Sequence, residues 1–333
     1  MKEAGLYTRL ENLVVRCQLC AHSCKITDGK FGFCKVRQNI SGILYTHNYA
    51  KLLAANIDPV EKKPLYHFLP GTKTFSIASA GCNFRCGFCQ NWEISQFDSN
   101  QQYLGENFSP DKVIKLAKKN NCSSIAYTYT EPTVYLEFVL EVAKLAKAAG
   151  LRNIFITNGY LSQKAISLLA PYLDAVNIDL KFFKQSSYQR ICLASLEPVL
   201  DAIKLFNAAG VWVEVTTLVI PGENDTLEEL TAMAKFIVTV DRNIPWHLSR
   251  FFAAYKFNDY PATAEGTLKL AYDLGINQGL RYVYVGNFGA WGQDTVCFAC
   301  KKLLIKREGY KITQMHLAGN NCTFCQAELP GVF

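Results

Sequence analysis

Seven apolar segments along the middle of this 333-residue chain constrain its fold more than any other feature. Each is rich in the β-branched and aromatic residues of a strand that is buried on both faces. They are Thr74–Ala80, Ser124–Thr130, Asn153–Thr157, Ala175–Leu180, Val211–Ile220, Pro245–Phe251 and Arg281–Val285. Amphipathic helical stretches lie between them, for example Asp111–Asn120, Val134–Ala149, Ser162–Leu169, Glu197–Ala209 and Thr226–Val238. This alternation predicts a parallel sheet built from strand–helix units.

Six or seven such units favour an α/β fold, a partial (β/α)6 barrel of the TIM type. In such barrels the functional side chains lie at the carboxyl ends of the strands. Polar segments follow the predicted strands at these positions. They are a cysteine loop after Ala80, Thr130-Glu131-Pro132, Thr157-Asn158-Gly159, Asp179-Leu180-Lys181 and Pro221–Asp225, with Trp246–Arg250 on the sixth strand. We therefore expect a functional site at one rim of the barrel.

The chain has thirteen cysteines, and most of them fall into three clusters. These are Cys17, Cys20, Cys24 and Cys34; Cys82, Cys86 and Cys89; and Cys297, Cys300, Cys322 and Cys325. The N-terminus lacks the apolar region of a signal peptide, so C-x2-C spacing favours metal binding over disulfides. Cys122 and Cys192 stand alone and are interpreted as core residues.

The middle cluster has the spacing C-x3-C-x2-C within Gly81–Asn91. Three thiolates on one short loop can hold three corners of a 4Fe–4S cluster, which leaves one iron without a protein ligand. Such an open position can bind a substrate or cofactor. A structural zinc knuckle is the alternative, but it would need a distant fourth ligand.

This loop resembles the cysteine motif of radical S-adenosylmethionine (SAM) enzymes. The resemblance implies that SAM chelates the open iron and that Phe88 lies near the adenine. It also implies that one electron from the cluster cleaves SAM to methionine and a 5′-deoxyadenosyl radical, which abstracts a hydrogen from the substrate. Cys82, Cys86 and Cys89 would then be the catalytic ligands.

Further segments resemble those of the activating enzymes in this superfamily. Glu131 stands where many members carry a Gly-Gly-Glu segment that contacts the SAM ammonium group, although the glycines are absent here. The other residues that this resemblance assigns to SAM or substrate are Thr157, Asn158, Asp179, Lys181 and His247. The structural alternatives are a helix-capping Glu131, a rim ion pair between Asp179 and Lys181, and a packed His247.

Cys297-x2-Cys300 and Cys322-x2-Cys325 flank a hairpin-like stretch, as in a zinc ribbon. Four thiolates around tetrahedral Zn²⁺ would stabilise a tail with little core, and iron in a rubredoxin-like site is the alternative. The N-terminal set, Cys17-x2-Cys20-x3-Cys24-x9-Cys34, lacks this symmetry. It suits structural zinc, or a second iron–sulfur cluster that relays electrons.

The whole chain resembles the radical SAM protein of the AmmeMemoRadiSam system, with a barrel like that of the pyruvate formate-lyase activating enzymes. The match includes Tyr129–Pro132 and Asn287-Phe288 ahead of the tail. It implies three parts: a cysteine-rich segment at 1–60, a radical SAM barrel at 61–288 and a zinc-ribbon-like domain at 289–333. It also implies a flavodoxin or ferredoxin as electron donor, and an association with Memo-like and AMMECR-type proteins.

Composition and net charge bear on where the protein is located and on which partners it could bind. No apolar run approaches a membrane span, so we expect a cytoplasmic protein. The net charge of +7 is mild; it suits a phosphate-bearing partner such as RNA, but a solvated basic surface is the more common explanation. Glycyl-radical enzyme activation, modification of RNA or a metabolite, and a non-catalytic metal-binding or redox-sensing module are the functions to compare.

Overall fold

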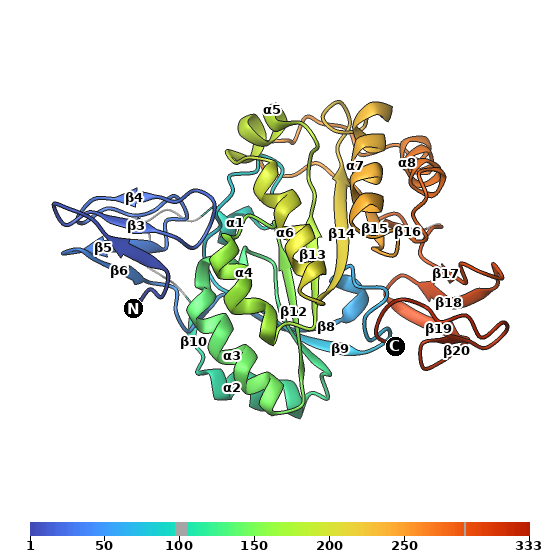
Figure 1. Cartoon of the computed structure of the whole chain (residues 1–333), viewed down its shortest axis with the longest axis horizontal. Coiled ribbons are helices and arrows are strands. Elements are labelled where there is room, and N and C mark those ends of the chain that lie inside the picture. The colour runs from blue at the N-terminus through green and yellow to red at the C-terminus, as the bar shows by residue number, and fades with distance from the viewer. Residues whose placement is uncertain (97–104, 290) are drawn as a thin grey trace.

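The computed structural model describes residues 1–96, 105–289 and 291–333, and Figure 1 shows a central barrel between two smaller β-rich ends. The central sheet has eight strands in the order β16-β15-β14-β13-β12-β11-β9-β8. Their bounds are β8 Ala54–Pro59, β9 Lys73–Ala78, β11 Ser124–Tyr127, β12 Arg152–Thr157, β13 Ala175–Asp179, β14 Trp212–Val219, β15 Trp246–Arg250 and β16 Val283–Gly286. Neighbouring strands are parallel, except that β8 runs antiparallel to β9.

The predicted fold class is confirmed, because each predicted apolar segment forms one of the parallel strands. The order begins at β8 and ends at β16, so the barrel is open, as a partial barrel must be. β8 lies within the predicted N-terminal segment at 1–60 yet belongs to the barrel's own sheet. The three-part division of the chain stays a prediction.

Helices cover the outer face of the sheet (Figure 1). Their bounds are α1 Trp92–Ser95, α2 Pro110–Lys119, α3 Leu136–Ala148, α4 Gln163–Leu169, α5 Gln185–Ser187, α6 Glu197–Ala208, α7 Leu227–Val240 and α8 Glu265–Asn277. Three of them begin at a hydroxyl cap: Ser109, Ser162 and Thr226 accept from a backbone N–H three residues on. Such caps satisfy N–H groups that have no partner inside the helix. No helix within the described residues is long and apolar enough to cross a membrane.

The two ends of the chain form small antiparallel sheets on opposite sides of the barrel (Figure 1). The N-terminal strands are β1 Lys2–Glu3, β2 Tyr7–Arg9, β3 Val15–Cys17, β4 Lys25–Ile26, β5 Arg37–Ile40 and β6 Ile43–Thr46, and β7 Lys51–Leu52 pairs with β10 Glu106–Asn107. The C-terminal strands are β17 Thr295–Val296, β18 Leu303–Glu308, β19 Lys311–Met315, β20 Leu317–Ala318 and β21 Asn321–Cys322. Both ends are too small to bury a large core of their own.

Candidate active site

A cavity of about 870 Å³ lies inside the barrel and at the carboxyl ends of its strands. This volume is typical of small-ligand sites. Every barrel residue that the sequence assigns to the site lines this cavity. These residues are Cys82, Cys86, Phe88, Cys89, Glu131, Thr157, Asn158, Asp179, Lys181 and His247. The structure therefore gathers them in one place, while the role of each stays a prediction.

The cysteine loop directly follows β9 and is held by its own hydrogen bonds. Arg85 Nη1 donates to Cys82 O and to Phe84 O, both at 2.8 Å, and Phe84 N–H donates to Cys82 Sγ at 3.3 Å. Burial raises the pKa of Cys82, and the contact with Cys192 together with burial raises the pKa of Cys86. Thiolates in this position therefore need a compensating cation, and a loop of three cysteines fits the iron of a cluster.

Glu131 is buried and its carboxylate is fully engaged. Oε1 accepts from Thr133 N–H (3.0 Å), from the Thr133 hydroxyl and from the Thr157 hydroxyl (2.8 Å), while Oε2 accepts from Asn158 N–H (2.8 Å). Burial raises the pKa of Glu131. The bond to Thr133 is the helix-capping contact that the sequence offered as the alternative. Glu131 therefore caps a short helix and also fixes the end of β12 beside the cavity.

Asn158 connects the end of β12 to the cysteine loop. Its Nδ2 donates to Asn83 Oδ1 at 2.7 Å, and its Oδ1 accepts from Tyr160 N–H at 3.0 Å. Because all polar groups of this side chain point at protein atoms, Asn158 sets the position of the loop relative to the barrel rim.

Asp179 and Lys181 form an ion pair at 2.8 Å at the end of β13. Burial alone would lower the pKa of Lys181, but Asp179 and the nearby thiols outweigh it and raise that pKa well above its usual value. The Lys181 ammonium also lies 5.7 Å from the ring centre of Phe88. The ring itself packs edge-on against Phe182 and Phe257. A fixed cation and an aromatic wall thus face the sulfurs.

His247 is held by an acid that the sequence analysis did not single out. Glu214 lies on β14, is fully buried, and contacts His247 Nε2 through Oε2 at 2.5 Å. Burial alone would raise the pKa of Glu214, but the His247 ring outweighs it and the net pKa is lowered. Tyr66 packs edge-on against the same ring at 4.8 Å. Glu214 is the single acid in the apolar run Val211–Ile220, and this is the sequence signal that could have identified it.

The cavity also has walls that the sequence did not predict. Lys63 and Tyr129 line it, and both contact Asp58 on β8, with Lys63 Nζ at 2.7 Å from the carboxylate. Burial lowers the pKa of Lys63 to about 8. Tyr310 reaches the cavity from the C-terminal sheet. Substrate space is therefore bounded by the barrel and by the tail together.

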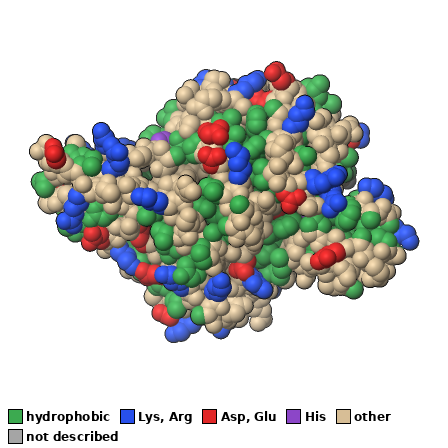
Figure 2. Space-filling view, in the orientation of Figure 1, with side chains coloured by type: hydrophobic (Ala, Val, Ile, Leu, Met, Phe, Trp, Pro, Cys, Tyr) green, Lys and Arg blue, Asp and Glu red, His purple; other side chains and the backbone are tan. Residues whose placement is uncertain are grey.

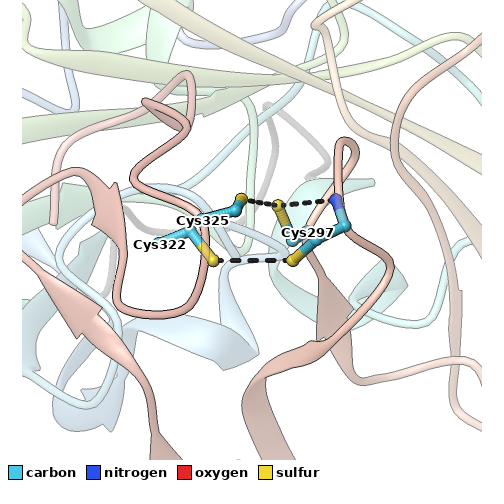
Figure 3. A group of neighbouring side chains, drawn as sticks. Cys297, Cys322 and Cys325 are labelled. Carbon is cyan, nitrogen blue, oxygen red and sulfur yellow. Dashed lines mark hydrogen bonds between the residues drawn. The ribbon is translucent and has the colours of Figure 1, made fainter.

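The C-terminal cysteines meet in a compact group (Figure 3). The sulfurs of Cys297 and Cys325 are 3.6 Å apart, and those of Cys300 and Cys322 are 3.8 Å apart. Thiolates around one tetrahedral ion at about 2.3 Å lie about 3.8 Å from each other. The geometry therefore fits a single ion held by four thiolates.

The four N-terminal cysteines lie together on and between β3, β4 and β5, but they do not form such a compact group. Cys17 belongs to the main hydrophobic core, and Cys20, Cys24 and Cys34 pack against that core. Cys122 and Cys192 are buried in that core, as predicted.

The model of the radical SAM superfamily matches residues 76–237 of the chain. An uncharacterized protein of Methanocaldococcus jannaschii is 43% identical over 329 residues, which is 98% of both chains. A putative glycyl-radical enzyme activating enzyme of the same organism is 25% identical over 187 residues, covering 53% of this chain and 66% of that one. The structure of Streptococcus suis SuiB bound to S-adenosylmethionine is similar in fold, with a TM-score of 0.52 at 14% identity over 72% of this chain and 56% of that chain.

The matched region begins on β9 and includes the whole C-x3-C-x2-C loop together with the strands β11 to β14 that surround the cavity. The chain therefore contains a radical SAM domain at residues 76–237.

Proposed function

We propose that this chain is an enzyme that cleaves SAM reductively at a 4Fe–4S cluster held by Cys82, Cys86 and Cys89, and that it removes a hydrogen atom from a substrate in the same cavity. When bound, the cluster and SAM supply an electron and a 5′-deoxyadenosyl radical. The observation that carries the proposal is the convergence of the three thiols with the polar rim residues in one cavity of about 870 Å³.

The chain's own residues would bind and orient the reactants. The Asp179–Lys181 pair presents fixed charge to the amino-acid part of SAM, and Phe88 offers an apolar surface to the adenine. Glu214 holds the His247 ring in one orientation at the cavity wall, where the ring is placed to contact the ribose. The carboxylate of Glu131 already accepts four hydrogen bonds from protein groups. Glu131 therefore acts mainly by positioning the ends of β11 and β12.

The remaining parts of the chain would support this reaction. We assign Zn²⁺ to the C-terminal cysteines because their sulfur spacing fits one tetrahedral ion. A flavodoxin or ferredoxin in the cytoplasm would supply the electron, and the two terminal regions, 1–60 and 289–333, would dock Memo-like, AMMECR-type or substrate proteins.

Activation of a glycyl-radical enzyme is the second candidate, and the relative described as a putative activating enzyme of that kind supports it. RNA modification has less support. Figure 2 shows basic and acidic side chains interspersed over the visible face, whereas phosphate binding favours a continuous basic surface. A glycyl-radical enzyme that co-purifies with the chain would favour activation, and binding that weakens as salt rises would favour RNA.

The test is anaerobic. The reconstituted and dithionite-reduced protein is mixed with SAM, and 5′-deoxyadenosine is measured by chromatography, with Cys86→Ala as the inactive variant. Cys122→Ala removes a buried cysteine far from the cavity lining and serves as the matched control. We expect product from the wild type and the control but not from Cys86→Ala. If SAM leaves the cluster's EPR spectrum unchanged and no product forms, the chain is a non-catalytic iron–sulfur or redox-sensing module.

A further inference from the structure

The four N-terminal cysteines lie close together in the chain's first small sheets, with Cys17 buried and Cys20, Cys24 and Cys34 partly buried. Cys17 ends β3 and its N–H donates to Cys24 O at 3.0 Å, which places the start of β4 beside it. All four are free thiols, and all pack against the same core cluster. Ser23 N–H donates to Cys20 O at 3.1 Å, and a Cβ on Gly32, two residues before Cys34, would lie 3.9 Å from Cys24 Sγ. The four cysteines therefore lie on neighbouring loops.

The spacing of these sulfurs differs from that at the other end of the chain. Among the described residues, only the C-terminal cysteines form a group whose ligand atoms all lie within 4.8 Å of one another. Neither the N-terminal four nor the Cys82, Cys86 and Cys89 set is that compact. One tetrahedral ion holds its thiolates about 3.8 Å apart, whereas a cluster of several irons holds each thiolate on a different iron and so farther from the others. The N-terminal four are therefore not arranged around one tetrahedral ion, and a cluster that binds each thiolate at a different iron is compatible with them.

A buried cation faces this group. Arg37 is 1% exposed, and its Nη2 pairs with Glu137 at 2.6 Å. Its Nε and Nη1 have no hydrogen-bond partner among the described residues. Its carbonyl oxygen accepts from Gly32 N–H at 2.8 Å, on the segment that carries Cys34. Buried N–H groups without partners cost free energy, so they point to an anion, and a metal cluster with four thiolates is one.

The N-terminal cysteines also touch the barrel's cysteine loop. A Cβ on Gly81 would lie 3.1 Å from Cys34 O, so the two loops are in van der Waals contact at a residue next to Cys82. His22 Nε2 lies 2.7 Å from Asn83 O, which joins the loop of Cys20 and Cys24 to the same segment. Arg85 also donates to Phe33 O, beside Cys34. Direct contacts therefore join the segment of the N-terminal cysteines to the cysteine loop of the barrel.

We propose that Cys17, Cys20, Cys24 and Cys34 hold a second, fully ligated iron–sulfur cluster of the 4Fe–4S type, which passes electrons to the cluster of the barrel. This replaces the zinc alternative at the N-terminus. One electron from a reduced flavodoxin- or ferredoxin-type carrier reduces the N-terminal site. The same electron then moves to the barrel site, and the N-terminal site returns to its oxidised state. With four protein ligands, this site has no open iron and does not bind SAM.

The metal content of the full-length chain tests the assignment. The variant with Cys82, Cys86 and Cys89 all changed to Ala cannot hold the barrel cluster. After anaerobic reconstitution we expect it to retain about four irons and about four sulfides per chain, against about eight of each in the wild type. Its reduced EPR signal should not change when SAM is added. Iron-free protein, with zinc or with no metal at the N-terminal cysteines, would overturn the proposal.

A reciprocal variant, Cys17→Ala with Cys34→Ala, should lose the SAM-insensitive signal and keep the SAM-sensitive one. Cys122→Ala is the matched control and should keep both.

The relay, which rests on the proposed function, is tested in the fully reduced wild type, where two adjacent paramagnets should broaden each other's EPR lines. A wild-type spectrum equal to the sum of the two variants would refute the relay. If the reciprocal variant fails to fold, the iron content of the triple variant still decides the cluster.

Discussion

Replacing Glu214 by Gln tests whether the buried acid organises the cavity wall. Each carboxylate oxygen of Glu214 accepts two hydrogen bonds. Oε1 accepts from His67 N–H (2.8 Å) and Trp212 Nε1 (3.0 Å), and Oε2 accepts from Tyr66 N–H (3.0 Å) and His247 Nε2 (2.5 Å). An amide has one acceptor oxygen. With its NH2 at the position of Oε2, Gln leaves Tyr66 N–H without an acceptor, because His247 Nε2 can accept from the NH2 as the other tautomer; the opposite orientation leaves both His67 N–H and Trp212 Nε1 without one.

The magnitude follows from the orientation that leaves one donor without an acceptor. A buried donor that loses its acceptor costs about 1–3 kcal/mol, so the free energy of unfolding should fall by at least that amount. This is a large fraction of the ~5–15 kcal/mol that stabilises most proteins. The assay is urea unfolding of the metal-loaded chain, followed by near-ultraviolet circular dichroism. Glu197→Gln is the matched control, because Glu197 is 72% exposed and lies 3.9 Å from its nearest cation.

The pH dependence gives a second readout of the same residue. The folded pKa of Glu214 is lowered from its ordinary 4.5. Its ionisation therefore contributes stability above that value, and the contribution is lost as the pH falls through the lowered folded pKa. Glu214→Gln should lack this part of the acid-side slope. A loss of under about 1 kcal/mol, with an unchanged slope, would refute the reasoning.

Three further outcomes are expected. Cys300→Ala should lose one zinc per chain by metal analysis and lower the midpoint of thermal unfolding, since the zinc proposed at these four thiols would stabilise a tail with little core. Burial lowers the pKa of His67 from 6.5 to about 4, so stability should fall as the pH drops between these values. His67→Gln should lack that slope in urea titrations. Gly81→Ala should destabilise the chain by about 1–3 kcal/mol, because its Cβ would lie 2.7 Å from Val36 Cγ1 at a φ of +97°. Cluster occupancy, measured as iron per chain, should fall with it.

The barrel and the place of its site could be predicted because both depend on local pattern. Apolar runs that alternate with amphipathic stretches determine a parallel sheet, and the polar residue after each strand must then lie at a shared rim. Glu131, Asn158 and Asp179 met at one cavity for this reason. The helix caps at Ser109 and Ser162 are equally local, since the hydroxyl and its acceptor N–H are three residues apart.

The tertiary contacts around the site residues join distant parts of the chain. His67 contacts Pro330 O, and Tyr66 O accepts from Arg307 Nη2, across 263 and 241 residues respectively. Sequence periodicity does not predict contacts between residues so far apart in the chain. The same holds for Arg37, whose partner Glu137 lies on α3, a hundred residues away.

These long-range contacts change how the tail should be understood. Tyr66 packs against His247 on one side, and Arg307 of β18 lies over the Tyr66 ring at 4.2 Å on the other. Arg307 is buried and stands 3.9 Å from Glu61, which also lines the cavity. An ion bound by the C-terminal cysteines would fix the sheet that carries Arg307, so loss of that ion would loosen a cavity wall and not only a peripheral knuckle. The proposed C-terminal metal would therefore contribute to the order of the cavity, even though none of its ligands lines that cavity.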